Sequence, residues 1–105
     1  MKPDKELLEL AAKAAGIESL WWTKDGNKLF QRNGGEQKPW NPLTDDGDAL
    51  RLAVKLKLSV SIFDDAIGVG RRSSSYGELE IQGDPYAATR RAIVRAAAAI
   101  GEQMK

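Results

Sequence analysis

The sequence predicts an α+β fold in which three helices pack with an antiparallel sheet of three to four strands. Apolar residues recur at helical spacing near residues 5–15, 45–57 and 85–103. Four short strand candidates lie between these helices, and residues 58–62 and 77–82 alternate apolar with polar side chains. The expected order is α-β-β-α-β-β-α. The expected architecture is a helix and sheet sandwich, with residues 1–105 forming a single domain.

The first helix is predicted over residues 5–15. Asp4 is its expected N-cap, and Gly16 is expected to end it in the left-handed conformation. Its apolar side chains share one face; they are Leu7, Leu8, Ala11, Ala14 and Ala15.

A hairpin is predicted next, because residues 20–23 and 28–31 flank Asp25 and Gly26, a pair that favours a tight turn. The polar, glycine-containing residues 32–38 are interpreted as a loop.

The second helix is predicted from Thr44 or Asp45 to about Lys57, because Pro39 and Pro42 prevent a helix from starting earlier. Its apolar stripe has the spacing of a buried face; the members are Ala49, Leu52, Ala53 and Leu56.

A second hairpin is predicted from residues 58–62 and 77–82, joined by a long mobile connection over residues 64–75. One face of this sheet is expected to be polar; its members are Ser59, Ser61, Glu78 and Glu80. The third helix is predicted over residues 85–103, with Asp84 as its N-cap. Its predicted buried face contains Tyr86, Ile93, Ala97, Ile100 and Met104.

Composition narrows the classes of function. The chain has no histidine and no cysteine, which excludes catalysis by a serine–histidine or cysteine–histidine pair within the chain. The formal net charge of +1 is unlike that of a strongly basic nucleic-acid binder. The charged first residues and the lack of a long apolar run lead us to expect a protein of the cytoplasm, in a bacterial host cell, without membrane contact.

Residues 40–56, beginning Trp-Asn-Pro-Leu-Thr-Asp-Asp-Gly-Asp, resemble the phage ABA sandwich domain family of small phage and prophage proteins. Residues 84–97 look like the closing helix of that family and residues 6–16 like its opening helix. The resemblance implies a phage setting and helices on both faces of a sheet, and it supplies no catalytic residue. The predicted polar sheet face departs from that arrangement.

Trp21 and Trp22 are the first candidate binding residues. Neighbouring strand residues point to opposite faces, so one tryptophan is expected to leave the core. An exposed tryptophan suits a protein interface. The alternative, which the sequence favours slightly, is that it covers the sheet edge or packs under Trp40.

A second candidate is the segment that contains Gly68, Gly70, Arg71 and Arg72. Glycines allow backbone amides to approach an anion, and arginine can bind a phosphate through two hydrogen bonds. No helix start and no phosphate-binding lysine follow. We therefore interpret the segment as a flexible contact loop.

Arg91 and Arg95 lie four residues apart on the outer face of the third helix, and Arg90 lies beside its apolar stripe. Together with Arg71 and Arg72, the outer arginines are candidates for a nucleic-acid patch.

The aspartates offer two interpretations. Asp45, Asp46 and Asp48 suit the N-terminus of a helix better than a calcium loop. Asp64 and Asp65 suit a solvated strand end better than a magnesium site shared with them.

The favoured hypothesis is a non-enzymatic phage or prophage accessory protein that binds a phage or host protein. The alternative is a weak nucleic-acid-binding protein that uses the arginine patch. A metal-dependent enzyme ranks last, and no cofactor, metal or catalytic residue is predicted.

Overall fold

The computed structural model describes residues 2–17, 19–33, 35–71 and 74–104, in which the chain forms three helices and six strands. In chain order these elements are α1 (Asp4–Ala15), β1 (Leu20–Trp22), β2 (Leu29–Asn33), β3 (Glu36–Pro39), α2 (Asp46–Leu56), β4 (Ser59–Ile62), β5 (Ala66–Arg71), β6 (Ser74–Glu80) and α3 (Pro85–Gln103). The predicted α+β class is confirmed, and each predicted hairpin contains one strand more than expected.

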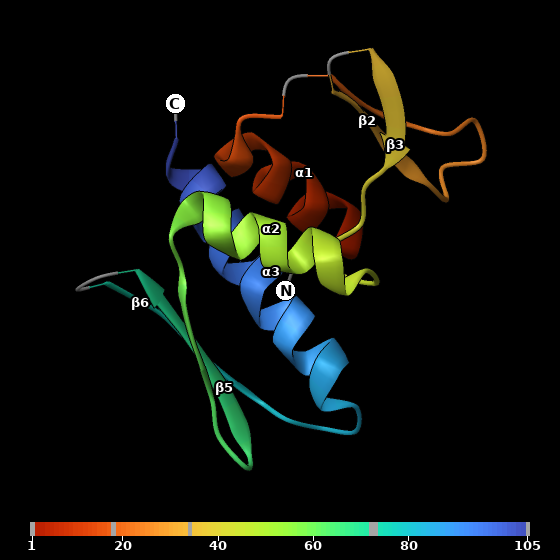
Figure 1. The fold of residues 1–105 in the computed structure, drawn as a ribbon. Helices are drawn as coiled ribbons and strands as arrows, with labels where there is room; N and C mark the ends of the chain where they lie inside the picture. Colours follow the sequence, from red (N-terminus) through yellow and green to blue (C-terminus); the bar gives the residue numbers. More distant parts are fainter. Residues whose placement is uncertain (1, 18, 34, 72–73, 105) are drawn as a thin grey trace.

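The strands form two separate antiparallel sheets, ordered β1-β2-β3 and β4-β5-β6, rather than one sheet of three to four strands. The three helices pack side by side between them, with the β4–β6 sheet against α3 and the β1–β3 sheet beyond α1 (Figure 1). The helical layer therefore separates the two sheets.

The helix boundaries follow the capping residues closely. Asp45 accepts a hydrogen bond of 2.8 Å from the Asp48 amide at the start of α2, and Asp84 accepts one of 2.9 Å from the Tyr86 amide at the start of α3. Both predicted caps are confirmed, as is the left-handed Gly16 after α1. The prediction for Asp4 is wrong, because Pro3 occupies the cap position of α1 and no side chain caps it.

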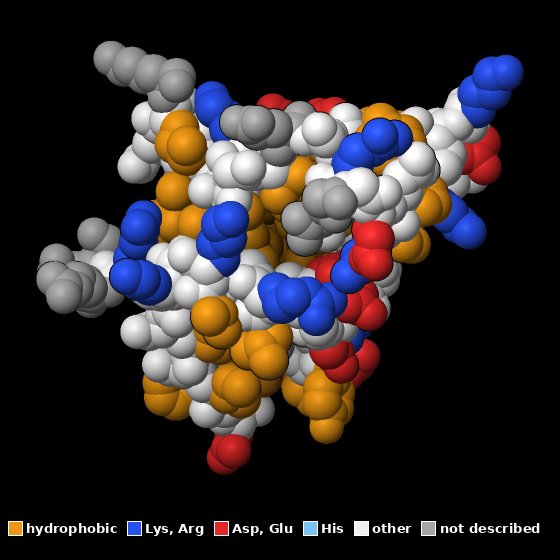
Figure 2. Space-filling view, turned by 45° about the horizontal axis from the view of Figure 1, so that its top comes forward, with side chains coloured by type: hydrophobic (Ala, Val, Ile, Leu, Met, Phe, Trp, Pro, Cys, Tyr) orange, Lys and Arg blue, Asp and Glu red, His pale blue; other side chains and the backbone are white. Residues whose placement is uncertain are grey.

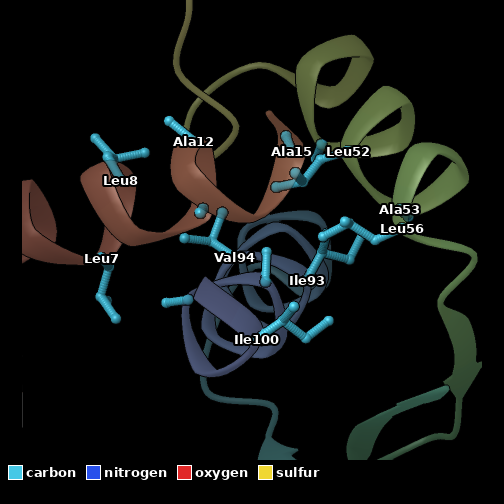
Figure 3. Close-up of a cluster of buried hydrophobic side chains, with 14 of the residues drawn as sticks. Leu7, Leu8, Ala12, Ala15, Leu52, Ala53, Leu56, Ile93, Val94 and Ile100 are labelled. Atoms are coloured by element: carbon cyan, nitrogen blue, oxygen red, sulfur yellow. The ribbon is translucent and has the colours of Figure 1, made fainter. Parts of the chain in front are cut away.

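The main core lies where the three helices meet. Figure 3 shows side chains of α1, α2 and α3 converging there, with Val94 fully buried on the face of α3 that meets α1. Small residues on α3 allow this close approach, and an added Cβ at Gly101 would overlap the carbonyl oxygen of Leu10. The alanine run of α3 thus serves close helix packing.

The prediction of a loop over residues 32–38 is wrong. β2 continues to Asn33, and β3 pairs with it from Glu36 to Pro39 after a turn in which Gly35 has φ 105°. All β3 side chains are exposed, so backbone pairing rather than apolar burial holds this strand.

The prediction of a mobile connection over residues 64–75 is also wrong, because residues 66–71 form β5, the central strand of the second sheet. Ile67 and Val69 alternate with glycines and are buried against α3. The glycines favoured the interpretation as a flexible loop. The alternation of apolar residues with glycines, which is the pattern of a strand buried on one face, is what forms β5. Residues 72–73, which belong to the same predicted connection, lie outside the described residues.

The polar face predicted for this sheet is confirmed. The four side chains are exposed; they are Ser59, Ser61, Glu78 and Glu80. Within the described part of the chain, α3 covers one face of the β4–β6 sheet and no helix covers the other. This sheet therefore differs from the arrangement that the family resemblance implies.

Asp48 ties the segment before α2 to the helix itself. Its side chain is nearly buried and accepts hydrogen bonds from the Asn41 amide at 2.9 Å and from Arg51 Nη2 at 2.8 Å. We expect Asp48→Ala to lower the free energy of unfolding by about 1–3 kcal/mol, because the Asn41 amide and the Arg51 guanidinium both lose an acceptor. Urea denaturation followed by circular dichroism measures the loss.

Arg51→Ala is the matched control for Asp48. The Arg51 side chain is 72% exposed, so its ion pair contributes less than about 1 kcal/mol. Equal losses in the two variants would show that Asp48 acts through the ion pair alone.

Candidate functional site

Trp21 and Trp22 point to opposite faces of β1, as strand alternation predicts. Trp22 faces the helices: its Nε1 donates to Glu9 Oε2 at 3.1 Å, and Lys5 Nζ lies 5.2 Å from its ring centroid. Trp22 therefore anchors the β1–β3 sheet to α1.

Trp21 lies on the outer face of the same sheet. It is the cross-strand partner of Phe30, and Phe30 is the partner of Pro39, so the three form a row across β1, β2 and β3. The Trp21 and Phe30 rings stack with centroids 6.1 Å apart and 16° between their planes, and the Arg32 guanidinium lies 6.0 Å from the Trp21 centroid. We call Trp21, Phe30, Pro39 and Arg32 the Trp21 surface.

The turn between β1 and β2 fixes the geometry of this surface. Asp25 Oδ1 accepts hydrogen bonds from the Thr23 hydroxyl and the Asn27 amide, and Gly26 takes φ 74°. The Thr23 hydroxyl, followed by the Asn27 amide, lowers the pKa of Asp25 below its ordinary value. The carboxylate stays ionised and holds the turn near neutral pH.

The charge around the Trp21 surface is mainly positive. The hairpin region carries Lys24, Lys28, Arg32 and Lys38 against Asp25 and Glu36. Lys38 pairs with Glu36 at 3.5 Å, whereas Arg32 forms no ion pair with the described residues. Among the residues that the structure describes, no carboxylate pairs with this cation beside the aromatic rings. Sequence reasoning did not connect Phe30, Arg32 and Pro39 with Trp21. It placed Arg32 in a loop and did not predict β3, whose pairing with β2 brings Pro39 beside Phe30.

A second surface surrounds an apolar groove of about 540 Å³ between α2, β4 and α3. Leu50, Ile62 and Tyr86 line it and are 64%, 67% and 69% exposed. Two further apolar side chains are exposed: Val54 on α2, and Phe63 directly after β4. Figure 2 shows hydrophobic side chains gathered in the lower part of the molecule. An exposed apolar patch of this kind is typical of an interaction surface.

Sequence reasoning missed this groove. It placed Tyr86 and Met104 on the buried face of α3, and both are exposed. Tyr86 lies in the first turn of α3, and Met104 follows its last residue. Leu50 and Val54 gave a signal, since they lie four residues apart on α2 outside its buried stripe.

The structure brings together two of the predicted arginines. Arg91 and Arg95 line one groove of about 530 Å³ on α3, together with Lys2 and Glu102, which pair with each other at 3.1 Å. Arg91 pairs with Asp4, with an Nη1 to Oδ1 distance of 3.1 Å. Arg71 ends β5 and does not line this groove.

The remaining candidates of the contact loop have different surroundings from those predicted. Gly68 and Gly70 lie within β5, where Gly70 pairs with Ser59 and Ser75, so they form no phosphate-binding loop. Arg72 lies outside the described residues.

The aspartates of α2 act within the fold. Asp45 caps α2, and Asp46 pairs with Arg90 at 2.6 Å, while Arg90 also donates to the Leu43 carbonyl at 2.8 Å. Among the described residues, no three carboxylates are grouped to hold a metal ion. Asp64 and Asp65 are exposed at the turn after β4.

Comparison with known proteins finds no matching family model, and no curated protein or solved structure matches the chain significantly. The phage setting that the sequence resemblance implies thus stays a prediction. Among the described residues, no helix has the length and apolar character needed to cross a membrane.

Proposed function

We propose that the chain is a non-enzymatic protein-binding module that recognises another protein through the Trp21 surface. The phage or prophage setting is the one implied by the resemblance of residues 40–56 and 84–97. The observation that carries the proposal is the row of Trp21, Phe30 and Pro39 on the outer face of a sheet whose inner face is already occupied by the core.

The geometry supports binding rather than folding as the task of Trp21. Trp22, Leu20 and Leu29 satisfy the packing of the inner face, and Trp40 fills the core behind the sheet. Trp21 is partly buried on the outer face, where its ring stacks on Phe30 and lies beside the Arg32 guanidinium. A rigid, amphipathic aromatic ring loses little entropy on binding, which is why tryptophan and arginine dominate interface energetics.

The expected partner is an acidic protein segment that carries an apolar or aromatic side chain. The apolar group would pack against Trp21 and Phe30, and a carboxylate would pair with Arg32. The basic side chains of the hairpin would attract such a segment and speed association.

Nucleic acid is the weaker proposal. In the groove that Lys2, Arg91 and Arg95 line, Asp4 pairs with Arg91 and Glu102 pairs with Lys2. The net charge of the chain is only +1. A nucleic-acid patch on α3 would thus have to compete with carboxylates of the fold for two of its three cations.

The test is affinity capture from lysates of phage-infected and lysogenic bacteria, with and without nuclease, using wild type, Trp21→Ala and Arg32→Glu. We expect a protein that survives nuclease treatment and whose affinity falls about tenfold or more in both variants, as for an interface hot spot. Titration calorimetry with the captured protein measures that loss.

Tyr86→Ala is the matched control, because it removes an exposed aromatic ring that lies on α3 and does not belong to the Trp21 surface. Its affinity for the captured protein should equal that of wild type. Undiminished binding by Trp21→Ala contradicts the proposal, and recovery that depends on nucleic acid and on Arg91 and Arg95 favours the alternative.

A further inference from the structure

β4 is an edge strand without the features that normally protect an edge. It pairs with β5 on one side, and its sequence Ser-Val-Ser-Ile holds no charge, proline or glycine. Two other edges differ: β3 contains Glu36, Lys38 and Pro39, and β6 contains Gly77 and two glutamates. The fourth edge, β1, is only three residues long. Charges and prolines on edges prevent pairing with other chains. Within the β4–β6 sheet, the edge without charge, proline or glycine is thus the β4 side.

The direction of the free hydrogen-bonding groups of β4 follows from the hairpin turn. The Phe63 amide donates to the Ala66 carbonyl at 2.9 Å, which makes Phe63 and Ala66 a hydrogen-bonded pair. Since such pairs alternate along an antiparallel ladder, Ser61 and Ser59 bond to β5, and Val60 and Ile62 point their amides and carbonyls outward.

We infer that a second copy of the chain pairs antiparallel along β4, with Val60 of each copy opposite Ile62 of the other. The two-fold axis then passes between the two Ser61 residues. Val60 and Ile62 exchange both backbone hydrogen bonds in each of the two equivalent pairs. The β4–β6 sheets of the two copies then form one continuous sheet. A two-fold contact of this kind uses the β4 edge of both copies, so assembly stops at the dimer.

Charge and apolar surface favour a second copy over another partner. Lys57 precedes β4 and Asp65 follows it, and both side chains are exposed. Antiparallel pairing in this register brings Lys57 of each copy to the Asp65 end of the other, so opposite charges meet at both ends. It also places Ile62, which is 67% exposed, beside an apolar strand residue of the other copy.

This contact is independent of the proposed function, because it uses none of the residues of the Trp21 surface. Failure of either idea leaves the other standing, and the variants below do not touch Trp21, Phe30 or Arg32.

The test uses the absence of cysteine in the chain. In the inferred register the two Ser61 Cα atoms form a non-hydrogen-bonded pair about 4.5 Å apart, a separation that a disulfide spans. We expect Ser61→Cys to form a covalent dimer under mild oxidation at least about tenfold faster than Ser59→Cys, since only in the former are the two thiols held together. Non-reducing electrophoresis gives both rates.

Sedimentation velocity over a concentration series is the second measurement. We expect wild type to dimerise reversibly and Ile62→Lys to raise the dimer dissociation constant about tenfold or more. At concentrations where both chains are monomeric, the melting temperature should be unchanged, because this side chain is exposed. Two results would overturn the inference: equal cross-linking rates at positions 59 and 61, or a wild-type chain that stays monomeric throughout. A monomeric wild-type chain is also the result expected if β4 pairs with a peptide of a different protein instead of a second copy.

Discussion

Replacement of Gly101 by alanine is expected to destabilise the protein by about 3 kcal/mol, a large share of the 5–15 kcal/mol that is usual for a domain. An added Cβ would overlap the Leu10 carbonyl oxygen and lie close to the Ala14 amide nitrogen, both on the backbone of α1. Backbone atoms cannot move aside as a side chain can, so α1 and α3 would have to separate along the most extensive helix contact of the described chain. Thermal unfolding followed by circular dichroism measures the effect.

Gly47→Ala is the matched control for this prediction. Gly47 lies in the first turn of α2, and an added Cβ there would approach the flexible end of the Arg51 side chain and the Asp45 carboxylate. Alanine favours a helix over glycine by about 1 kcal/mol, so this variant should be neutral or slightly more stable. If Gly101→Ala were as stable as Gly47→Ala, the close packing of α1 on α3 would be refuted.

Replacement of Trp40 by alanine is expected to cost about 3–5 kcal/mol, because it empties a large site in the core. Trp40 is 4% exposed, and its amide donates to the Leu29 carbonyl at 2.8 Å where the β1–β3 sheet joins the helices. We expect loss of cooperative unfolding or a much lower urea midpoint, measured by circular dichroism.

Trp21→Ala provides the comparison within the same sheet. Its ring is partly buried on the outer face and does not belong to the core cluster, so its removal should lower the free energy of unfolding by about 1 kcal/mol. The two substitutions should thus have different effects: Trp40→Ala lowers stability, and Trp21→Ala lowers partner affinity. A larger stability loss at Trp21 than at Trp40 would contradict this division.

The helices could be predicted from the sequence because their signals are local. Asp45, Asp84 and Gly16 mark helix ends through hydrogen bonds and backbone conformations that need no tertiary contact. The exception, Asp4, lost its predicted role because Pro3 already occupies the cap position.

The central strand β5 and the edge strand β3 could not be predicted in the same way. Glycine occupies the outer positions of β5, and β3 buries none of its side chains, so composition in both segments resembles that of a loop. Pairing with distant residues decides these strands, and a single sequence does not show pairing.

The candidate surfaces also combine features set by local sequence with features set by contacts between distant residues. Strand alternation predicted that Trp21 and Trp22 would diverge, which is a local rule. The alignment of Trp21 with Phe30 and Pro39, and the meeting of Leu50, Ile62 and Tyr86 at one groove, depend on register and helix packing. The arginines were predicted as one patch because the sequence cannot show that Asp4 lies beside Arg91.

The two sheets lie on opposite sides of the helical layer, and this arrangement affects how strongly the protein can hold its target (Figure 1). A pair joined through β4 carries two Trp21 surfaces, each separated from the joint by its own helices. If the target is itself repetitive, a second contact forms at the high effective concentration set by the first. Individually weak contacts then give a long-lived complex through avidity, without any enlargement of either surface.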